Sequence, residues 1–118
     1  MSEFKNKIKA VSLFSNVGIA ETYFDDVGVS VAVANELIDV RAKFYKHLYP
    51  GVEMIVGDIT DDAVFNKVID SAIESKVEML IATPPCQGMS CAGRKDPKDP
   101  RNFLVYYAVE AIKKIKPK

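Results

Sequence analysis

Several features that identify common protein classes are rare or absent in this chain of 118 residues. Its two cysteines, Cys86 and Cys91, are too few for a disulfide framework, and their spacing differs from that of the common zinc-binding pairs. Its only histidine, His47, has no cysteine or aspartate at ligand spacing, so we expect a helix-capping or surface residue and no metal site. The low cysteine content favours a reducing compartment, the cytoplasm.

Two further absences concern nucleic acids and membranes. Sixteen basic and sixteen acidic residues give a formal net charge of zero, so any binding of nucleic acid must come from a local patch. No stretch approaches the ~20 consecutive apolar residues that a membrane span needs, and the first residues contain no small-residue cleavage site. We therefore expect a cytoplasmic protein without a membrane partner.

Short apolar segments alternate with amphipathic segments along the whole chain. Strands are predicted at Ile8–Phe14, Val29–Ala34, Met54–Val56 and Met79–Ala82. Helices are predicted at Ala20–Val27, Val40–Leu48, Val64–Ile73 and Leu104–Ile115. Strands joined through helices are parallel, so the pattern predicts one α/β domain with a parallel sheet covered on both faces.

Local signals support two of the predicted helices. Val40, Phe44 and Leu48 share one helical face, which is the spacing of an apolar stripe. Asp61 or Asp62 can cap the N-terminus of the next helix, because an aspartate side chain accepts hydrogen bonds from the first free N–H groups.

A polar stretch follows each of the four predicted strands. These stretches are Ser15-Asn16, Asn35-Glu36, Gly57-Asp58 and Thr83–Gln87. Because the carboxyl ends of parallel strands meet at one edge of the sheet, where α/β proteins bind ligands, these residues are expected to lie together. The sequence therefore predicts a binding site at this edge.

The turn after the first strand, in the stretch FSNVGIAE, contains a single glycine, Gly18. A dinucleotide is disfavoured, because the G-x-G-x-x-G motif that admits a pyrophosphate is missing. A ligand with one carboxylate needs fewer N–H groups and one point of close approach, although an ordinary turn explains this stretch equally well.

Two acidic residues at the strand ends suit a nucleoside. Glu36 can accept hydrogen bonds from both hydroxyls of a ribose, and Asp58 can accept from an adenine amino group. The alternatives are a solvated carboxylate for Glu36 and an Asx turn for Asp58. Taken with Gly18, the two acids indicate a nucleoside site with a small anion at one end.

Cys86 follows Pro84-Pro85 in the stretch ATPPCQGMS, where the strand must stop and the chain must turn outward. A buried cysteine usually acts as a small hydrophobe, but the stiff backbone at Pro85 suits a reactive thiol better. A thiol becomes a nucleophile when nearby N–H groups or cations stabilise the thiolate. Arg94 and Arg101 in the following loop can supply such charge or bind phosphates.

The segments LFSNVGIAE, ANELID, GDIT, PPCQGMS and DPRNFL occur in this order from Leu13 to Leu104. In this respect the chain resembles the first half of the cytosine-5 DNA methyltransferases, and PPCQG is the most specific element. The resemblance implies a partial Rossmann-like, S-adenosylmethionine-dependent methyltransferase fold, with four parallel strands in the order third, second, first, fourth. Residues 1–118 would form the N-terminal portion of a single catalytic domain.

The resemblance also implies roles for individual residues. Cys86 would attack carbon 6 of a cytosine flipped out of double-stranded DNA, after which carbon 5 takes the methyl group. S-adenosylmethionine would contact Phe14, Asn16, Gly18, Glu36, Leu37, Asp58, Ile59 and Pro84. Glu36 would hold its ribose. The DNA phosphate or target nucleotide would contact Gln87, Ser90 and Arg101.

The chain departs from the family pattern at several of these positions. The family's first motif usually reads DLFxGxGG, whereas Ser12, Asn16 and Ile19 here replace the acid, the first glycine and the last glycine. Leu37 stands where an aromatic residue often stacks on adenine, and Pro84 stands where phenylalanine is common. Weaker cofactor stacking is therefore expected.

The family's later motifs and target-recognition domain do not follow within these residues. We therefore expect the chain alone to be inactive, with a complementary subunit or a second copy pairing along the open edge of Met79–Ala82. One alternative is a non-catalytic fragment that binds a nucleoside or another subunit. Another is part of an RNA cytosine-5 methyltransferase.

Overall fold

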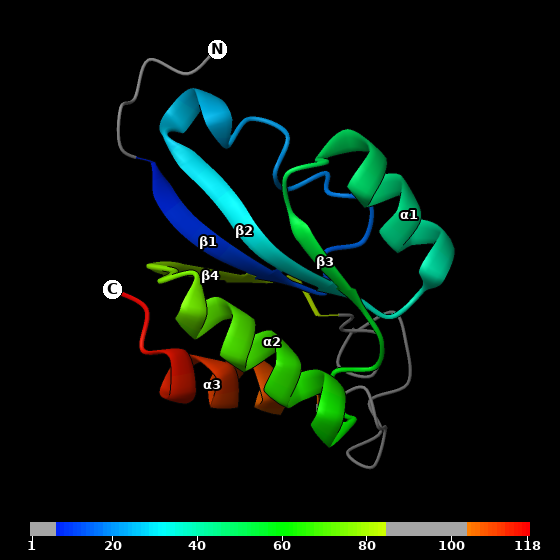
Figure 1. Cartoon of the computed structure of the whole chain (residues 1–118), viewed down its shortest axis with the longest axis vertical. Coiled ribbons are helices and arrows are strands. Elements are labelled where there is room, and N and C mark those ends of the chain that lie inside the picture. Colours follow the sequence, from blue (N-terminus) through cyan, green and yellow to red (C-terminus); the bar gives the residue numbers. More distant parts are fainter. Residues whose placement is uncertain (1–6, 85–103) are drawn as a thin grey trace, which may run out of the picture.

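The computed structural model describes residues 7–84 and 104–118, which form a parallel sheet with helices on both faces (Figure 1). Its strands are β1 (Ile8–Leu13), β2 (Val29–Glu36), β3 (Glu53–Val56) and β4 (Met79–Ala82). They pair in the order β3-β2-β1-β4, and every pair is parallel. The predicted α/β class, strand positions and strand order are confirmed.

The helices divide between the two faces of the sheet. They are α1 (Asp39–Leu48), α2 (Asp62–Glu74) and α3 (Leu104–Ile115). Figure 1 shows α2 and α3 side by side on one face and α1 on the other. The face under α2 and α3 carries a core cluster of eleven buried residues, whereas the cluster under α1 has three: Ala34, Tyr45 and Val52.

Helix α2 forms as its sequence predicts. Asp61 is its N-cap, and the side chain accepts hydrogen bonds from the N–H groups of Ala63 and Val64. Its apolar stripe buries Phe65 and Val68 together with two further residues against the sheet, and Phe65 meets Tyr107 of α3 edge to face at 5.7 Å between ring centroids. This cap and this stripe fix α2 and bring α3 alongside it.

The predicted helix over Ala20–Val27 is wrong. The segment folds as successive turns whose N–H groups bond three residues back, and only η1 (Asp25–Val27) is a 3₁₀-helix. Gly28 ends it in the left-handed conformation, with a φ of 79°. Short helices depend on packing, and Tyr23 and Val27 of the expected stripe remain 72% and 62% exposed. β-branched, aromatic and aspartate residues also lower the local helix propensity.

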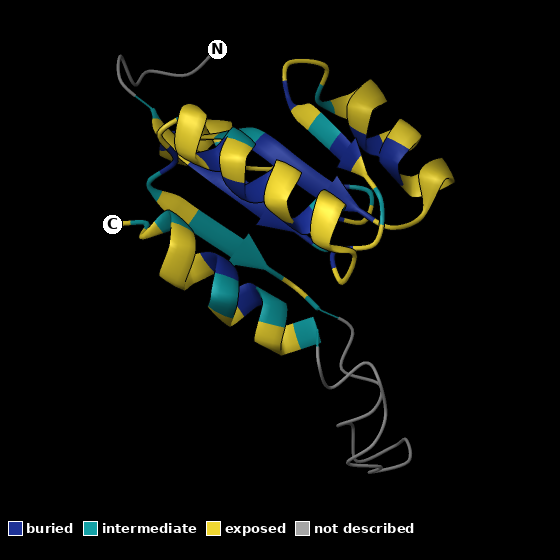
Figure 2. Ribbon diagram, turned by 60° about the horizontal axis from the view of Figure 1, so that its bottom comes forward, coloured by how far each residue is buried: buried dark blue, intermediate teal, exposed yellow. Residues whose placement is uncertain are grey.

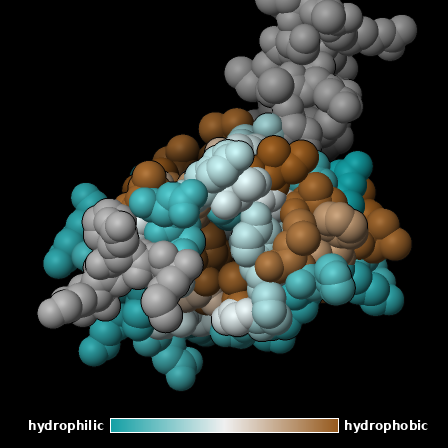
Figure 3. Space-filling model, turned by 90° about the horizontal axis from the view of Figure 1, so that it is seen from above, coloured by the Kyte–Doolittle hydropathy of each residue, from teal (hydrophilic) through white to brown (hydrophobic). Residues whose placement is uncertain are grey.

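The apolar face predicted for α1 is not the face that packs on the sheet. Val40, Phe44 and Leu48 are all exposed, while Ala42 and Tyr45 are buried. Spacing showed that the three apolar side chains share a face but could not show which way this face points. Figure 3 shows that apolar side chains reach the surface beside polar ones on the side of the molecule drawn there.

Strand β4 lies at an edge of the sheet and is less covered than β1 and β2 (Figure 2). Met79 is exposed, and the rest of β4 is half-buried. On the neighbouring α3, Val105, Val109 and Ile112 are also exposed. Among the residues that the structure describes, no helix has the length and apolar character to cross a membrane.

Candidate functional site

The carboxyl ends of the strands surround a cavity of about 430 Å³. This volume lies in the range of ~300–1,000 Å³ that is usual for small-molecule sites. The residues that line it are Phe14, Asn16, Asn35, Glu36, Leu37, Ile38, Arg41, Gly57, Asp58, Ile59, Thr83 and Leu104. Six of the eight residues expected at the cofactor therefore gather around one cavity, and Gly18 and Pro84 do not line it.

Glu36 ends β2 and lies at the centre of this arrangement. Its side chain is buried, with 6% of the residue exposed. One carboxylate oxygen, Oε1, accepts the N–H of Asn16 at 2.9 Å, and the other, Oε2, accepts the N–H of Ile38 at 2.9 Å. Each carboxylate oxygen can accept a second hydrogen bond, so both remain able to accept from a pair of ligand hydroxyls.

The loop after β1 has an unusual backbone that explains one departure from the family motif. Phe14 and Asn16 have positive φ angles of 56° and 54°. Asparagine tolerates this left-handed conformation better than most residues, so Asn16 can stand where the motif has glycine. Ile19, at the position of the motif's last glycine, is not among the described residues with positive φ and needs no glycine.

Gly18 is required for a different reason from the one predicted. Its φ is +83°, and an added Cβ would lie 2.4 Å from Cε2 of Tyr49 and 2.9 Å from the ring of Tyr45. The Tyr49 hydroxyl donates to the Gly18 carbonyl at 2.8 Å. The loop is thus pressed against two aromatic rings, from α1 and its end, that are not among the residues lining the cavity.

Asn35 supports the site in a way that sequence reasoning missed. Its side-chain amide donates to the carbonyls of Ile55 at 2.8 Å and Gly57 at 3.1 Å. These bonds hold the end of β3 beside the end of β2, and they place Gly57 and Asp58 at the cavity. The only signal in the sequence was the place of Asn35 in the polar stretch Asn35-Glu36 after the second predicted strand.

Asp58 forms the Asx turn that was considered as its alternative role. Its Oδ1 accepts both the N–H and the hydroxyl of Thr60, at 2.9 and 2.7 Å. The side chain is exposed, whereas neighbouring Ile59 is 3% exposed and supplies an apolar wall. Leu37 lines the same cavity and is 61% exposed.

Three lining residues were not predicted: Ile38, Arg41 and Leu104. The Thr83 hydroxyl donates to the Phe14 carbonyl at 3.1 Å and so joins the end of β4 to the loop after β1. Leu104 begins α3, which shows that this helix also reaches the cavity. Only the folded arrangement brings these residues to the site.

Of the other predicted site residues, the structure describes only Pro84. Pro84 is half-buried next to Thr83. Cys86, Gln87, Ser90 and Arg101 lie outside the described residues. Within residues 7–84 and 104–118, no group of three or more histidine, cysteine or acidic side chains is arranged to hold a metal ion.

A buried polar cluster lies at the same end of β1. It contains Glu21 (4% exposed), Ser12 (1%) and Tyr45 (0%). Burial raises the pKa of the Glu21 carboxyl above its ordinary value, and the nearby hydroxyls of Tyr45 and Ser12 lower it in part. An acid is therefore present at this end of β1, although the family's acidic position holds Ser12.

The sheet order and the cavity at its carboxyl edge define a partial Rossmann-like fold of the methyltransferase type. It resembles a putative DNA modification methyltransferase encoded within a prophage (E. coli), with a TM-score of 0.73 at 20% identity, over 94% of this chain and 30% of that one. It also resembles a Spodoptera frugiperda DNMT2 variant, with a TM-score of 0.61 at 22% identity, over 92% and 32% of the respective chains. These likenesses concern the fold.

The profile of the C-5 cytosine-specific DNA methylase family matches residues 8–118, so the chain belongs to this family. It is 47% identical to the type II methyltransferase M1.HgaI of Avibacterium volantium, over 96% of this chain and 33% of that relative. It is 32% identical to the type II methyltransferase M.AquIA of Picosynechococcus, over 93% of this chain and 45% of that relative. The chain thus spans a third to just under half of the length of these two relatives.

Proposed function

We propose that this chain is the cofactor-binding and nucleophile-bearing part of a DNA cytosine-5 methyltransferase. The observation that carries the proposal is the cavity at the carboxyl ends of the strands, with the buried carboxylate of Glu36 in its wall, in a member of the cytosine-5 methylase family. The chain would form the N-terminal portion of one catalytic domain, and it would work in the cytoplasm.

The residues around the cavity suit S-adenosylmethionine, which supplies an electrophilic methyl group when it is bound. Glu36 has the free acceptor capacity to take two ribose hydroxyls. Leu37 and Ile59 offer apolar surface for an adenine ring, and the second carboxylate oxygen of Asp58 remains for its amino group. Of the remaining predicted contacts, Phe14 and Asn16 at the cavity would serve the amino acid end of the cofactor, and Gly18 would support their loop. Pro84 would contact the cofactor beside Thr83.

The chemistry would use Cys86. Its thiolate would add to carbon 6 of a cytosine flipped out of double-stranded DNA, which makes carbon 5 nucleophilic enough to take the methyl group. Loss of the proton from carbon 5 would then expel the thiolate and restore the aromatic ring. Gln87, Ser90 and Arg101 would contact the target nucleotide or the DNA phosphate.

A mechanism-trapping experiment tests this assignment. The chain is combined with the C-terminal part of a related methyltransferase, and DNA carrying a fluorinated cytosine is added with S-adenosylmethionine. Fluorine at carbon 5 prevents proton loss, so a covalent protein–DNA adduct should accumulate. Without the second part, the chain should form no adduct.

Two cysteine variants provide the matched comparison. Cys86→Ser should abolish the adduct, and Cys91→Ser should leave its yield unchanged. Peptide mass spectrometry would identify the residue bonded to DNA in any adduct. An adduct formed by the Cys86→Ser protein would refute the role of Cys86.

We further propose that the outer edge of β4 and the exposed face of α3 are covered by the rest of a methyltransferase domain. The chain spans only part of its relatives, and no strand of residues 7–84 and 104–118 pairs with the outer edge of β4, which is therefore a template for one more parallel strand. Met79 on β4 and Val105, Val109 and Ile112 on α3 add apolar surface beside it.

Without that occupant, the chain should not remain a monomer at micromolar concentration. Sedimentation velocity should show self-association, which Val109→Lys should weaken and which Val40→Lys, on the exposed side of α1, should leave unchanged. A folded monomer across the micromolar range, with slowly exchanging amides in Met79–Ala82, would contradict the proposal. Association that Val109→Lys does not affect would exclude this face of α3.

A further inference from the structure

The loop from Phe14 to Gly18 has two sides with different surroundings. On one side, Phe14 and Asn16 line the cavity at the carboxyl ends of the strands. On the other side, Gly18 packs against the rings of Tyr45 and Tyr49. Any group that supports the loop from this second side can alter the cavity without lining it.

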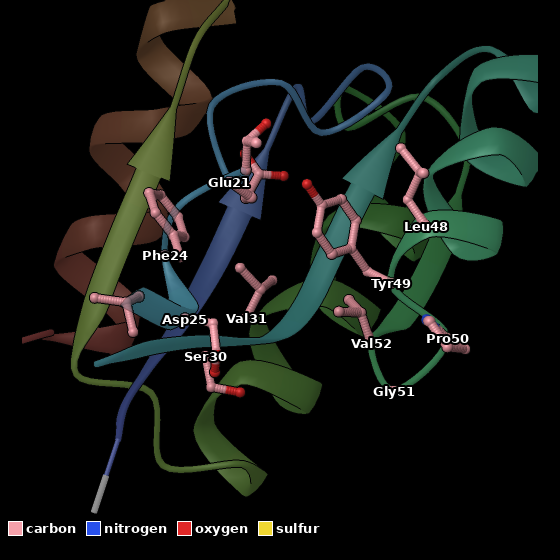
Figure 4. Close-up of a pocket in the computed structure, with 12 residues that line it drawn as sticks. Glu21, Phe24, Asp25, Ser30, Val31, Leu48, Tyr49, Pro50, Gly51 and Val52 are labelled. Carbon is pink, nitrogen blue, oxygen red and sulfur yellow. The ribbon is translucent and has the colours of Figure 1, made fainter. Parts of the chain in front are cut away.

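Glu21 is placed to give such support. Its backbone N–H donates to the Gly18 carbonyl at 3.2 Å, the same oxygen that accepts the Tyr49 hydroxyl at 2.8 Å. Its side chain is buried beside Ser12 of β1 and Tyr45 of α1. Figure 4 shows the Glu21 carboxyl and the Tyr49 hydroxyl directed toward the same space, above the residues of β2.

The backbone of the loop is hydrogen-bonded directly to Glu36, the predicted ribose acceptor. The N–H of Asn16 donates to Oε1 of Glu36 at 2.9 Å, and the N–H of Ser15 donates to the Asn35 carbonyl at 3.1 Å. The N–H of Gly18 in turn donates to the Ser15 carbonyl at 3.0 Å. A displacement of Gly18 would therefore disturb the backbone groups that hold Glu36.

Three buried polar groups in and behind the loop have no partner at hydrogen-bond geometry among the described residues: Oε2 of Glu21, the hydroxyl of Tyr45 and Oγ of Ser15. The Tyr45 hydroxyl nevertheless lies close enough to Glu21 to lower the pKa of its carboxyl. Buried polar groups are normally satisfied, and an ionised carboxylate in such a place is costly without a cation. A second cavity, of about 360 Å³, is lined by both Glu21 and Asp25. The cation nearby, Lys7, is paired with Asp25 and not with Glu21.

We propose that Glu21 is a positioning residue for the cofactor loop: its buried carboxyl group, between Ser12 and Tyr45, holds Gly18 and thereby the Asn16–Glu36 contact in the geometry that binds the cofactor. This inference rests on the proposed cofactor site. Protonated Glu21 needs no cation and can donate a hydrogen bond, so it supports the loop. Ionised Glu21 places an unpaired negative charge behind the loop and displaces it.

The test compares binding of S-adenosylhomocysteine to the 118-residue chain across pH, by calorimetric titration. The affinity of the unmodified chain should fall as pH rises through the raised pKa of Glu21, because the protonated form binds the ligand. The fall should be about tenfold for each unit by which ligand binding raises that pKa further. Glu21→Gln keeps the shape of the side chain but cannot ionise, so its affinity should not show this fall. Glu74→Gln, at an exposed site on α2, is the matched control. Comparison with it corrects for any pH dependence that comes from titration of the ligand itself.

A second variant separates positioning from simple structural support. The Tyr45 hydroxyl lowers the pKa of Glu21, so Tyr45→Phe should move the fall in affinity to higher pH. A purely structural defect would instead lower the affinity equally at every pH. This variant also decides the question if Glu21→Gln does not fold.

Amide chemical shifts of the ligand-free chain give a readout that does not depend on the cofactor. The amides of Asn16 and Gly18 should titrate in the unmodified chain and not in Glu21→Gln. If the unmodified chain binds S-adenosylhomocysteine with the pH profile of Glu21→Gln and these amides do not titrate, the inference is wrong. If it binds at no pH, the proposed cofactor site fails, and the amide titration alone then shows whether Glu21 positions the loop.

Discussion

The two faces of the sheet differ in how they are built. The face under α2 and α3 has eleven buried apolar residues in one cluster, and α2 begins with a side-chain cap. The face under α1 has three residues in its cluster. The N-cap residue of α1 provides no side-chain cap, and turns replace the helix predicted before β2. One face is a conventional hydrophobic core, and the other is held by polar and aromatic contacts.

The difference separates stability from the shape of the site. Burial of apolar surface is the largest favourable term in folding, so the α2 and α3 face should dominate the free energy of unfolding. The α1 face instead carries the contacts that shape the cavity: Asn16 with Glu36, and Gly18 with Tyr45 and Tyr49. Substitutions on the first face should cost the most stability, and those on the second should cost less stability but also change ligand affinity.

Phe65→Ala should give the largest effect, a fall in the free energy of unfolding, because it truncates a core residue of the face under α2 and α3. Truncation of a buried phenylalanine typically costs about 3–5 kcal/mol, and here it also removes the contact with Tyr107. Urea denaturation followed by circular dichroism would measure the loss. Phe44→Ala on the exposed side of α1 is the control and should cost under ~1 kcal/mol. Equal costs for the two variants would contradict the division between the faces.

Glu36→Ala should weaken cofactor binding more than it weakens the fold. Removal of a charged acceptor of hydrogen bonds costs ~1.5–3 kcal/mol, which corresponds to more than tenfold in the dissociation constant. Stability should also fall modestly, because the N–H groups of Asn16 and Ile38 lose their acceptor. Titration with S-adenosylmethionine would measure the affinity, with Glu74→Ala as the control. An unchanged dissociation constant would remove Glu36 from the cofactor site.

Gly18→Ala should give a smaller effect and sharpens the comparison within the α1 face. The new Cβ would meet Tyr49 and Tyr45 at 2.4 and 2.9 Å, and the residue would keep a φ of +83°. Such strain costs about 1–3 kcal/mol, part of which the rings can relieve by shifting. Thermal unfolding would measure it. Gly51→Ala has open space around its Cβ and should be nearly neutral; a similar cost at both glycines would argue against strain at Gly18.

Most of the fold could be predicted because its signals are local. β4 was predicted with its observed limits, and the cap at Asp61 follows from the hydrogen-bonding capacity of one side chain. The convergence of Glu36 and Asp58 on one cavity follows from a general property of parallel sheets. None of these predictions required knowledge of a specific long-range contact.

The failures have a common cause. The apolar spacing around Tyr23 and Val27 is that of a helix, and that of Val40, Phe44 and Leu48 is that of a core-facing stripe. In both cases the residues are exposed. Periodicity shows that side chains share a face, but it does not show what lies opposite that face. Glu21 was missed because an acidic residue within a predicted helix gives no sign in the sequence that it will be buried.

The sequence by itself determined the α/β alternation, the four parallel strands and the set of polar residues at their carboxyl ends, because strand propensity, capping and crossover geometry act over short stretches of chain. Only the tertiary structure decided that Asn35 ties β3 to β2, that Thr83 joins β4 to the loop after β1, and that Glu21 is buried beside Tyr45. Each of these contacts joins residues about 20 or more positions apart. Their geometry depends on how α1 and the strand ends pack together, which no local pattern encodes.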